Sequence, residues 1–186
     1  MPIDVPPPVP QTAIVAGGCF WCIEHSIAHH KGVLKAVSGY TGGHVKNPTY
    51  EQIGTGKTGH YEAVKVVFDP KVISYRELLD YYFKLFDHTD PDGSFADRGP
   101  QYRSAIFYLN ETQKKAAIEA KTAVDRSGKF PRKVVTAILP AGQFYDAEAY
   151  HQDYGDRNPL HYQMYKKGSG REKFQKDHWP WELPNF

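Results

Sequence analysis

The chain has 186 residues, 40% of them hydrophobic, which is enough for one domain with its own core, and no second domain is expected. Its net charge of +2 arises from 23 basic and 21 acidic residues, which argues against nucleic acid or an anionic membrane as a partner. The 2 cysteines exclude a disulfide framework of the secreted kind and favour the reducing cytoplasm. No stretch approaches ~18 uninterrupted apolar residues, so no membrane-spanning helix is expected. We expect a monomer.

The N-terminal half is expected to begin with an extended arm over residues 1–11, because prolines dominate this stretch. Apolar runs and glycine punctuation then predict a strand, a helix from Cys19 to about His30, and two further strands. These strands are expected at 12–18, 32–40 and 61–69, with a glycine-rich loop over 41–60.

The second half is expected to continue with alternating helices and strands. Ser74 followed three residues later by Glu77 is a capping-box pattern, and the apolar residues after it predict a helix. A turn-rich loop is then expected over 88–101 and a strand over 102–110. Asn110 is expected to cap a helix over 111–126, and a strand is expected over 133–139. From about residue 140 the chain is expected to be rich in loops and aromatic side chains.

This order of elements predicts an α+β fold. Its first six elements match the split βαβ pattern of a two-layer α/β sandwich with a ferredoxin-like core. We therefore expect a single catalytic domain over residues 12–186, with a loop-rich C-terminal extension from about residue 140.

The most informative stretch of the sequence is "IVAGGCFWCIE", which holds both cysteines. At the first turn of a helix, Cys19 would face unpaired N–H groups and the positive end of the helix dipole, which favour the reactive thiolate. Three interpretations of the Cys-x-x-Cys pattern are open. A zinc half-site would need two further ligands, and there is no second cysteine pair. Two buried structural thiols are a second interpretation, and a redox pair that closes a disulfide explains the pattern best.

Four segments taken together resemble one known family. They are "GGCFWCIE", "NPTYEQIGTGKTGHYEAVKVVFDP", "ADRGPQYRSAIFY" and "AEAYHQDY", and in this order they look like peptide methionine sulfoxide reductase A. The match covers about residues 14–154 and is closest to the branch with Gly-Cys-Phe-Trp-Cys. The resemblance implies an enzyme that reduces the S epimer of methionine sulfoxide, free or in proteins, with thioredoxin as reductant and no cofactor or metal.

The resemblance also assigns roles to the cysteine turn. It implies that Cys19 attacks the sulfoxide sulfur and that Phe20 and Trp21 form the pocket for the methyl group. Many family members carry resolving cysteines in a glycine-rich C-terminal tail, and the tail of this chain has none. Cys22 is therefore expected to resolve the sulfenic acid on Cys19 as a disulfide.

Further site residues follow from the same resemblance. Glu62 is implied as the acid, Tyr50 and Tyr102 as hydroxyls that hold the sulfoxide oxygen, Asp97 as an organiser of the site, and His151 as a neighbour of the substrate. An acid is chemically required, because oxygen leaves sulfur poorly unless it is protonated or hydrogen-bonded. Burial beside aromatic rings would keep the Glu62 carboxyl neutral near pH 7.

Two other functional classes stay open. The same Cys19 and Cys22 pair could serve a general thiol–disulfide oxidoreductase or a redox sensor, which would reduce protein disulfides without turning over sulfoxides. A non-enzymatic module could bind oxidised peptides, and its affinity would survive the loss of Cys19.

Overall fold

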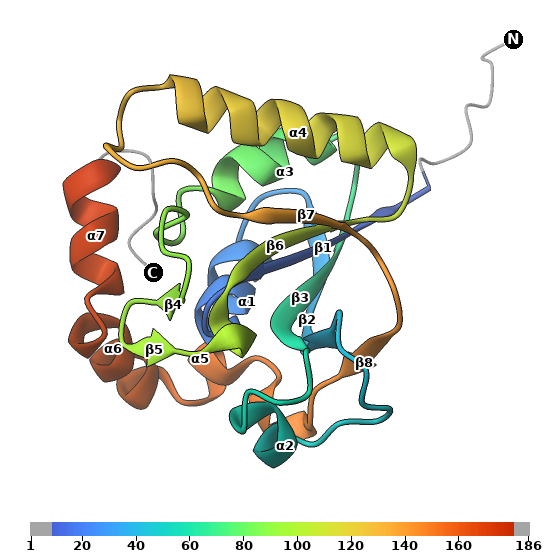
Figure 1. The fold of residues 1–186 in the computed structure, drawn as a ribbon, viewed down its shortest axis with the longest axis vertical. Coiled ribbons are helices and arrows are strands. Elements are labelled where there is room, and N and C mark those ends of the chain that lie inside the picture. Colours follow the sequence, from blue (N-terminus) through green and yellow to red (C-terminus); the bar gives the residue numbers. More distant parts are fainter. Residues whose placement is uncertain (1–8, 181–186) are drawn as a thin grey trace, which may run out of the picture.

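The computed structural model describes residues 9–180, and Figure 1 shows its elements. The strands are β1 (Gln11–Gly17), β2 (Val33–Thr41), β3 (Tyr61–Phe68), β4 (Gly93–Ser94), β5 (Asp97–Arg98), β6 (Ser104–Tyr108), β7 (Ala137–Pro140) and β8 (Phe144–Asp146). The helices are α1 (Phe20–Ala28), α2 (Tyr50–Gly54), α3 (Tyr75–Tyr82), α4 (Glu111–Arg126), α5 (Tyr154–Arg157), α6 (Pro159–Gly168) and α7 (Arg171–His178). The protein therefore has a mixed α/β fold.

A six-stranded sheet with the order β7-β6-β1-β3-β2-β8 forms the centre of the molecule. Its neighbouring strands are antiparallel except β6 and β7, which are parallel and connected through α4. The parallel pair needs this crossover, because two parallel strands cannot be joined by a tight turn. The chain between β7 and β8 then runs from one edge of the curled sheet to the other (Figure 1).

The two faces of the sheet bury different cores. Alternation along β1 directs Ala13 and Val15 to one face and Ile14 and Ala16 to the other. The first face packs under α1, α3 and α4, whose apolar side chains join it in the larger core. The second face is covered by side chains of β7, β8 and the chain between them. The curl of the sheet thus buries the face that the helices leave uncovered.

Most expected elements in the first 126 residues are confirmed. The capping box at Ser74 and Glu77 is present, and the Asn110 side chain accepts from the Gln113 N–H at the start of α4. The loop expected over 41–60 contains the short helix α2, and the strand expected over 133–139 begins only at Ala137. Residues 1–8 of the expected arm lie outside the described residues, and Gln11 already belongs to β1.

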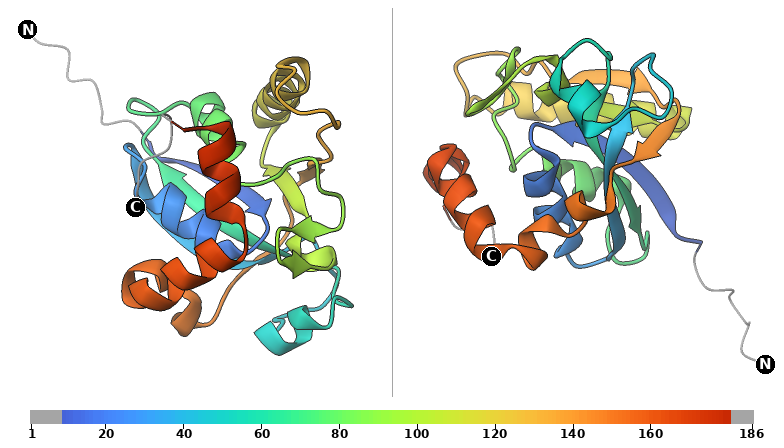
Figure 2. Two further views of the ribbon diagram at one scale, coloured as in Figure 1. Left: turned by 90° about the vertical axis from the view of Figure 1, so that its left-hand side faces the viewer. Right: turned by 90° about the horizontal axis from the view of Figure 1, so that it is seen from below.

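The expectation of a loop-rich segment from residue 140 is wrong. This part contains β8, α5, α6 and α7, and the three helices lie along one side of the molecule (Figure 2). Their sequences lack a continuous apolar stripe, and tertiary hydrogen bonds hold α7 in place. Arg171 Nη1 and Gln175 Nε2 both donate to the Leu85 carbonyl, at 2.8 and 3.1 Å. A helix docked by polar groups is not visible in hydrophobic periodicity.

No helix among residues 9–180 is both long enough and apolar enough to cross a membrane.

Candidate active site

The cysteine turn lies where β1 ends and α1 begins. Cys19 is the N-cap of α1, and its carbonyl accepts from the Cys22 N–H at 3.2 Å and from the Ile23 N–H at 3.4 Å. The preceding Gly18 has a φ of +90°, and a Cβ there would lie 2.3 Å from the Ser94 Cβ. Only glycine tolerates both constraints. The sharp turn brings the thiol of Cys19 back over the end of the sheet.

Glu62 lies directly beside this turn. It is at the start of β3 and shares a face of the sheet with Val64 and Val66, so its side chain points toward α1. Its Oε2 accepts from the Phe20 N–H at 3.1 Å. This bond satisfies one of the unpaired N–H groups at the helix start, and it fixes a buried carboxyl next to Cys19.

The expected site residues converge on one small cavity of about 40 Å³. It is lined by Cys19, Phe20, Trp21, Tyr50, Glu62, Asp97, Tyr102 and Tyr165. These side chains come from α1, α2, β3, β5, the 3-10 turn Pro100–Tyr102 and α6. Seven of the nine residues expected from the sequence therefore meet at this cavity, and Tyr165 joins them from the part of the chain where no site residue was expected.

The aromatic wall is held by contacts behind it. The Trp21 Nε1–H donates to His151 Nδ1 at 3.0 Å, and the Trp21 ring stacks on Tyr154 at 3.8 Å between ring centroids. His151 is fully buried, with ring centroids 5.0 Å from Phe20 and 4.3 Å from Tyr50. The structure thus places His151 behind Phe20, Trp21 and Tyr50, and not on the cavity surface.

Glu148 positions Tyr50, a contact that the sequence did not reveal. Its Oε2 accepts from the Tyr50 N–H at 3.0 Å, and its Oε1 accepts from the Tyr40 hydroxyl at 2.9 Å. Glu148 is 98 residues away from Tyr50 along the chain, so only tertiary structure brings them together. Thr49 and Gln52 form a capping box that supports the same end of α2.

Asp97 is presented by a small hairpin, in which β4 pairs with β5. Its Oδ2 accepts from the Tyr165 hydroxyl of α6. Tyr165 therefore joins α6 to the hairpin at the wall of the cavity. The aromatic content of the C-terminal segment was the one sequence signal for this contact, although it did not single out Tyr165.

The two thiols are buried and free, and they differ electrostatically. Burial raises the pKa of Cys19 well above its ordinary value, and the nearby Cys22, Glu62 and Asp97 raise it further. The hydrogen bond from Cys19 lowers the pKa of Cys22, against the effect of burial, and the positive charges of Arg171 and Lys166 assist. The thiolate expected at Cys19 is therefore disfavoured in this structure. The effect of burial, which raises the pKa, is larger than the effect of the helix N-terminus, which would lower it.

Glu62 is held in its neutral form. Burial, followed by the negative charges of Asp97 and Cys22, raises the pKa of its carboxyl to about 8, although the Phe20 N–H bond acts in the opposite direction. Burial and the Glu62 charge also raise the pKa of Tyr50 to about 12 and that of Tyr102 further. Near neutral pH, the Glu62 carboxyl and the hydroxyls of Tyr50 and Tyr102 in the cavity wall thus all carry protons.

Among residues 9–180, the one close group of three potential metal ligands consists of His25, His29 and Asp156 and includes neither cysteine. The two histidines lie near the end of α1, and Asp156 lies in α5. His25 and His29 are four residues apart, which is a spacing typical of paired metal ligands on a helix. This histidine pair was not among the residues expected from the sequence.

Comparisons with known proteins agree with this geometry. The family model described as peptide methionine sulfoxide reductase matches residues 11–183. MsrA 2 of Staphylococcus aureus (strain Mu50 / ATCC 700699) is 53% identical over 169 residues, covering 91% of this chain and 96% of that protein. MsrA of Bacillus licheniformis is 50% identical and covers 91% and 93%.

Solved structures show the same similarity. Mxr1 from Saccharomyces cerevisiae in reduced form superimposes with a TM-score of 0.76 at 33% identity, covering 81% of this chain and 86% of that one. Mxr1 in complex with Trx2 matches with a TM-score of 0.56 at 26% identity and covers 82% and 90%.

The fold and these relatives define an oxidoreductase. The chain belongs to the peptide methionine sulfoxide reductase A family and is a methionine sulfoxide reductase.

The raised pKa of Glu62 predicts a specific dependence of stability on pH. The folded state keeps the Glu62 proton up to about pH 8, whereas the unfolded chain releases it near pH ~4.3. Because the folded state then binds more protons, the free energy of unfolding should fall as pH rises between these values. Glu62→Gln should flatten this slope in urea titrations across the window. Glu119→Gln, at an exposed position of α4, should leave it unchanged, and an equal slope in all three proteins would show that Glu62 is ionised throughout.

Proposed function

We propose that the protein reduces the S epimer of methionine sulfoxide with Cys19 as nucleophile and Cys22 as resolving residue. One observation carries the proposal: Cys19, a protonated Glu62 and the rings of Phe20 and Trp21 line one buried cavity. A nucleophile, an acid and an apolar wall are what sulfoxide reduction needs, and no metal or cofactor takes part in the proposed steps.

The chemistry proceeds in two balanced steps. The Cys19 sulfur forms a bond to the sulfoxide sulfur, the S–O bond breaks, and the protonated oxygen leaves as water. Water then attacks the Cys19 sulfur and the S–S bond breaks, which gives the thioether and a sulfenic acid on Cys19. The sulfur of methionine is reduced by two electrons and the sulfur of Cys19 is oxidised by two. Cys22 then attacks the sulfenic acid, so that a disulfide and one water form. A reduced dithiol protein must restore the two thiols by exchange.

Glu62 supplies the proton that this first step requires. Its neutral carboxyl donates to the sulfoxide oxygen as negative charge builds on it, and it adds no negative charge beside Cys19. The hydroxyls of Tyr50 and Tyr102 line the same cavity and act as further donors to that oxygen. Asp97 organises the site through its bond to Tyr165.

Phe20 and Trp21 bind the methyl group of the substrate. Their rings form the apolar part of the cavity wall, and His151 and Tyr154 hold Trp21 in position from behind. His151 therefore acts on substrate binding through Trp21. The cavity has room for only a few water molecules, so its walls must widen when the substrate enters.

The charges around Cys22 suit the resolving step. Arg171 is 1% exposed, and together with Lys166 it favours the Cys22 thiolate, which is the form that attacks a sulfenic acid. Residues three apart on a helix have Cβ atoms ~5–6 Å apart, whereas a disulfide wants ~3.5–4.5 Å. The first turn of α1 must therefore loosen when the bond forms.

We propose thioredoxin as the reductant. The support is the likeness to Mxr1, which has been solved in complex with Trx2. The small number of cysteines is consistent with a reducing cytoplasmic setting, which we propose together with a monomeric state and no nucleic-acid or membrane partner.

We also propose that residues 12–186 form the catalytic domain, built on a ferredoxin-like split βαβ core. The strand order β6-β1-β3-β2 at the centre of the sheet supports this core, with β7 and β8 added at its edges.

The decisive test of the proposed function is stereochemical. The cavity offers different surfaces to the methyl group and the oxygen, so dithiothreitol and the enzyme should reduce only the S epimer of methionine sulfoxide. The two purified epimers should be assayed separately for methionine release. Equal rates would contradict an asymmetric pocket, and disulfide reduction without any sulfoxide turnover would favour the general thiol–disulfide oxidoreductase.

Glu62→Gln tests the acid. The variant should release methionine in a single turnover about 10²-fold or more slowly, as is usual when an acid catalyst is lost. The unmutated rate should decline as pH rises through about 8, where the Glu62 carboxyl ionises, and the variant should lack this decline. Rapid-quench measurements from pH 6 to 10 would show both effects. An unchanged rate and pH profile would transfer the acid role to a tyrosine.

Cys22→Ser tests the resolving residue. This variant should still release about one methionine per enzyme in a single turnover, because Cys19 is the only one of the two cysteines that takes part in the step on the substrate. It should fail to cycle with thioredoxin, and Cys19→Ser should release none. Peptide mapping of the oxidised unmutated protein should show a Cys19–Cys22 bond. Cycling of Cys22→Ser at the full rate would make Cys22 a structural thiol.

A further inference from the structure

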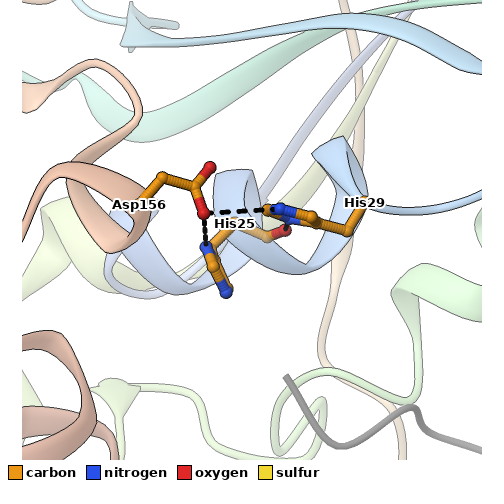
Figure 3. Close-up of side chains that lie close together, drawn as sticks. All are labelled: His25, His29 and Asp156. Carbon is orange, nitrogen blue, oxygen red and sulfur yellow. Dashed lines mark hydrogen bonds and ion pairs between the residues drawn. The ribbon is translucent and has the colours of Figure 1, made fainter. Parts of the chain in front are cut away.

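A second cluster of reactive side chains lies on the last turn of α1, outside the cavity of the thiols. His25 and His29 come from α1, and Asp156 comes from α5 (Figure 3). Asp156 Oδ1 is 3.4 Å from His25 Nδ1 and 3.4 Å from His29 Nε2. All three ligand atoms lie within 4.8 Å of one another.

The hydrogen bond of His29 fixes which of its nitrogens can bind a cation. Its Nδ1 lies 2.7 Å from the His25 carbonyl, and because a carbonyl can only accept, Nδ1 must carry the proton. In the neutral ring the lone pair is then on Nε2, the atom that faces Asp156. A histidine whose other nitrogen donates to a carbonyl is typical of metal ligands.

The separations fit a tetrahedral ion. With bonds of about 2.0–2.2 Å to nitrogen and oxygen, two ligand atoms on a tetrahedral Zn²⁺ are about 3.3–3.5 Å apart. Both Asp–His separations have this value, and the two histidine nitrogens lie within 4.8 Å of each other.

Two contacts hold α5 against α1 beside these three side chains. Gly155 packs directly on His25, and a Cβ there would lie 2.5 Å from His25 Nδ1. The Asp153 N–H donates to Glu24 Oε1 at 3.2 Å, which ties the start of α5 to α1. Asp153 itself has a left-handed φ of 52°, a conformation that costs free energy in a residue other than glycine.

We propose that His25, His29 and Asp156 bind one Zn²⁺ ion, with water in the fourth position. The site is separate from Cys19 and Cys22, which it does not need for binding. The ion fastens α1, which carries the two cysteines, to α5, which carries the ring of Tyr154 stacked on Trp21. Two imidazoles and one carboxylate are a ligand set typical of zinc with an open position.

Zinc titration of a variant without thiols tests this directly. The Cys19→Ser/Cys22→Ser protein removes thiolate ligation and should still bind one Zn²⁺ per chain, measured by competition with a chromophoric chelator. In this background His29→Gln and Asp156→Asn should each weaken binding at least tenfold, since even lost contacts to a ligand's partners cost ~10–100-fold. His30→Gln is the matched control, because His30 is the next residue along the chain and is outside the group. It should bind as its parent does.

Cobalt gives a second readout that does not depend on activity. Co²⁺ in the same background should show the visible absorption of a tetrahedral ion with nitrogen and oxygen ligands, and Asp156→Asn should abolish it. The proposal is wrong if the variant without thiols binds no zinc, or if His30→Gln weakens binding as much as His29→Gln. It is also wrong if circular dichroism shows that Asp156→Asn is folded and its zinc affinity is unchanged.

Discussion

The hydrogen bond from the Phe20 N–H to Glu62 determines how the active site is assembled. It joins the first turn of α1 to the start of β3, two segments 42 residues apart in the sequence. The same bond holds a buried carboxyl beside Cys19. The bond itself lowers the pKa of this carboxyl, but burial raises it by more, so that the pKa is about 8. One contact therefore positions the acid against the helix start, and burial keeps that acid protonated.

The helices at the C-terminal end complete the enclosure that this chemistry needs. Arg171 donates to the carbonyls of Leu85 and Gly17 and to the Ser94 hydroxyl, at 2.8, 3.3 and 3.1 Å. These bonds fasten α7 behind the cysteine turn, while Tyr165 of α6 reaches Asp97 on the other side. The exclusion of water strengthens every electrostatic effect inside the cavity. This includes the burial that disfavours a charge on Cys19 before substrate arrives.

The same α1 helix takes part in two different clusters. Its first turn carries the thiols, and its last turn carries His25 and His29, which face Asp156. Because α5 contacts both His25 and Trp21, the two ends of the helix are connected by one short segment.

Short-range patterns in the sequence were enough to predict the central elements and the cysteine turn. Capping residues, alternating apolar runs and glycines act within a few residues of one another, so they predicted β1, α1, β2, β3, α3, β6 and α4, whereas α2, β4 and β5 lie in stretches expected to be loops. The family resemblance, and not local patterns, identified Glu62, Tyr50, Tyr102 and Asp97. A resemblance names such residues but does not show which contacts bring them together.

Only tertiary structure decided the helices after residue 140, because α7 is held by polar bonds from Arg171 and Gln175 to Leu85. Only tertiary structure placed Tyr165, Glu148 and the partners of His25, since these contacts join residues far apart in the chain. The pKa of Cys19 shows the same difference. The sequence predicts a helix start, which would lower this pKa, whereas burial, which raises it, is a property of the whole fold.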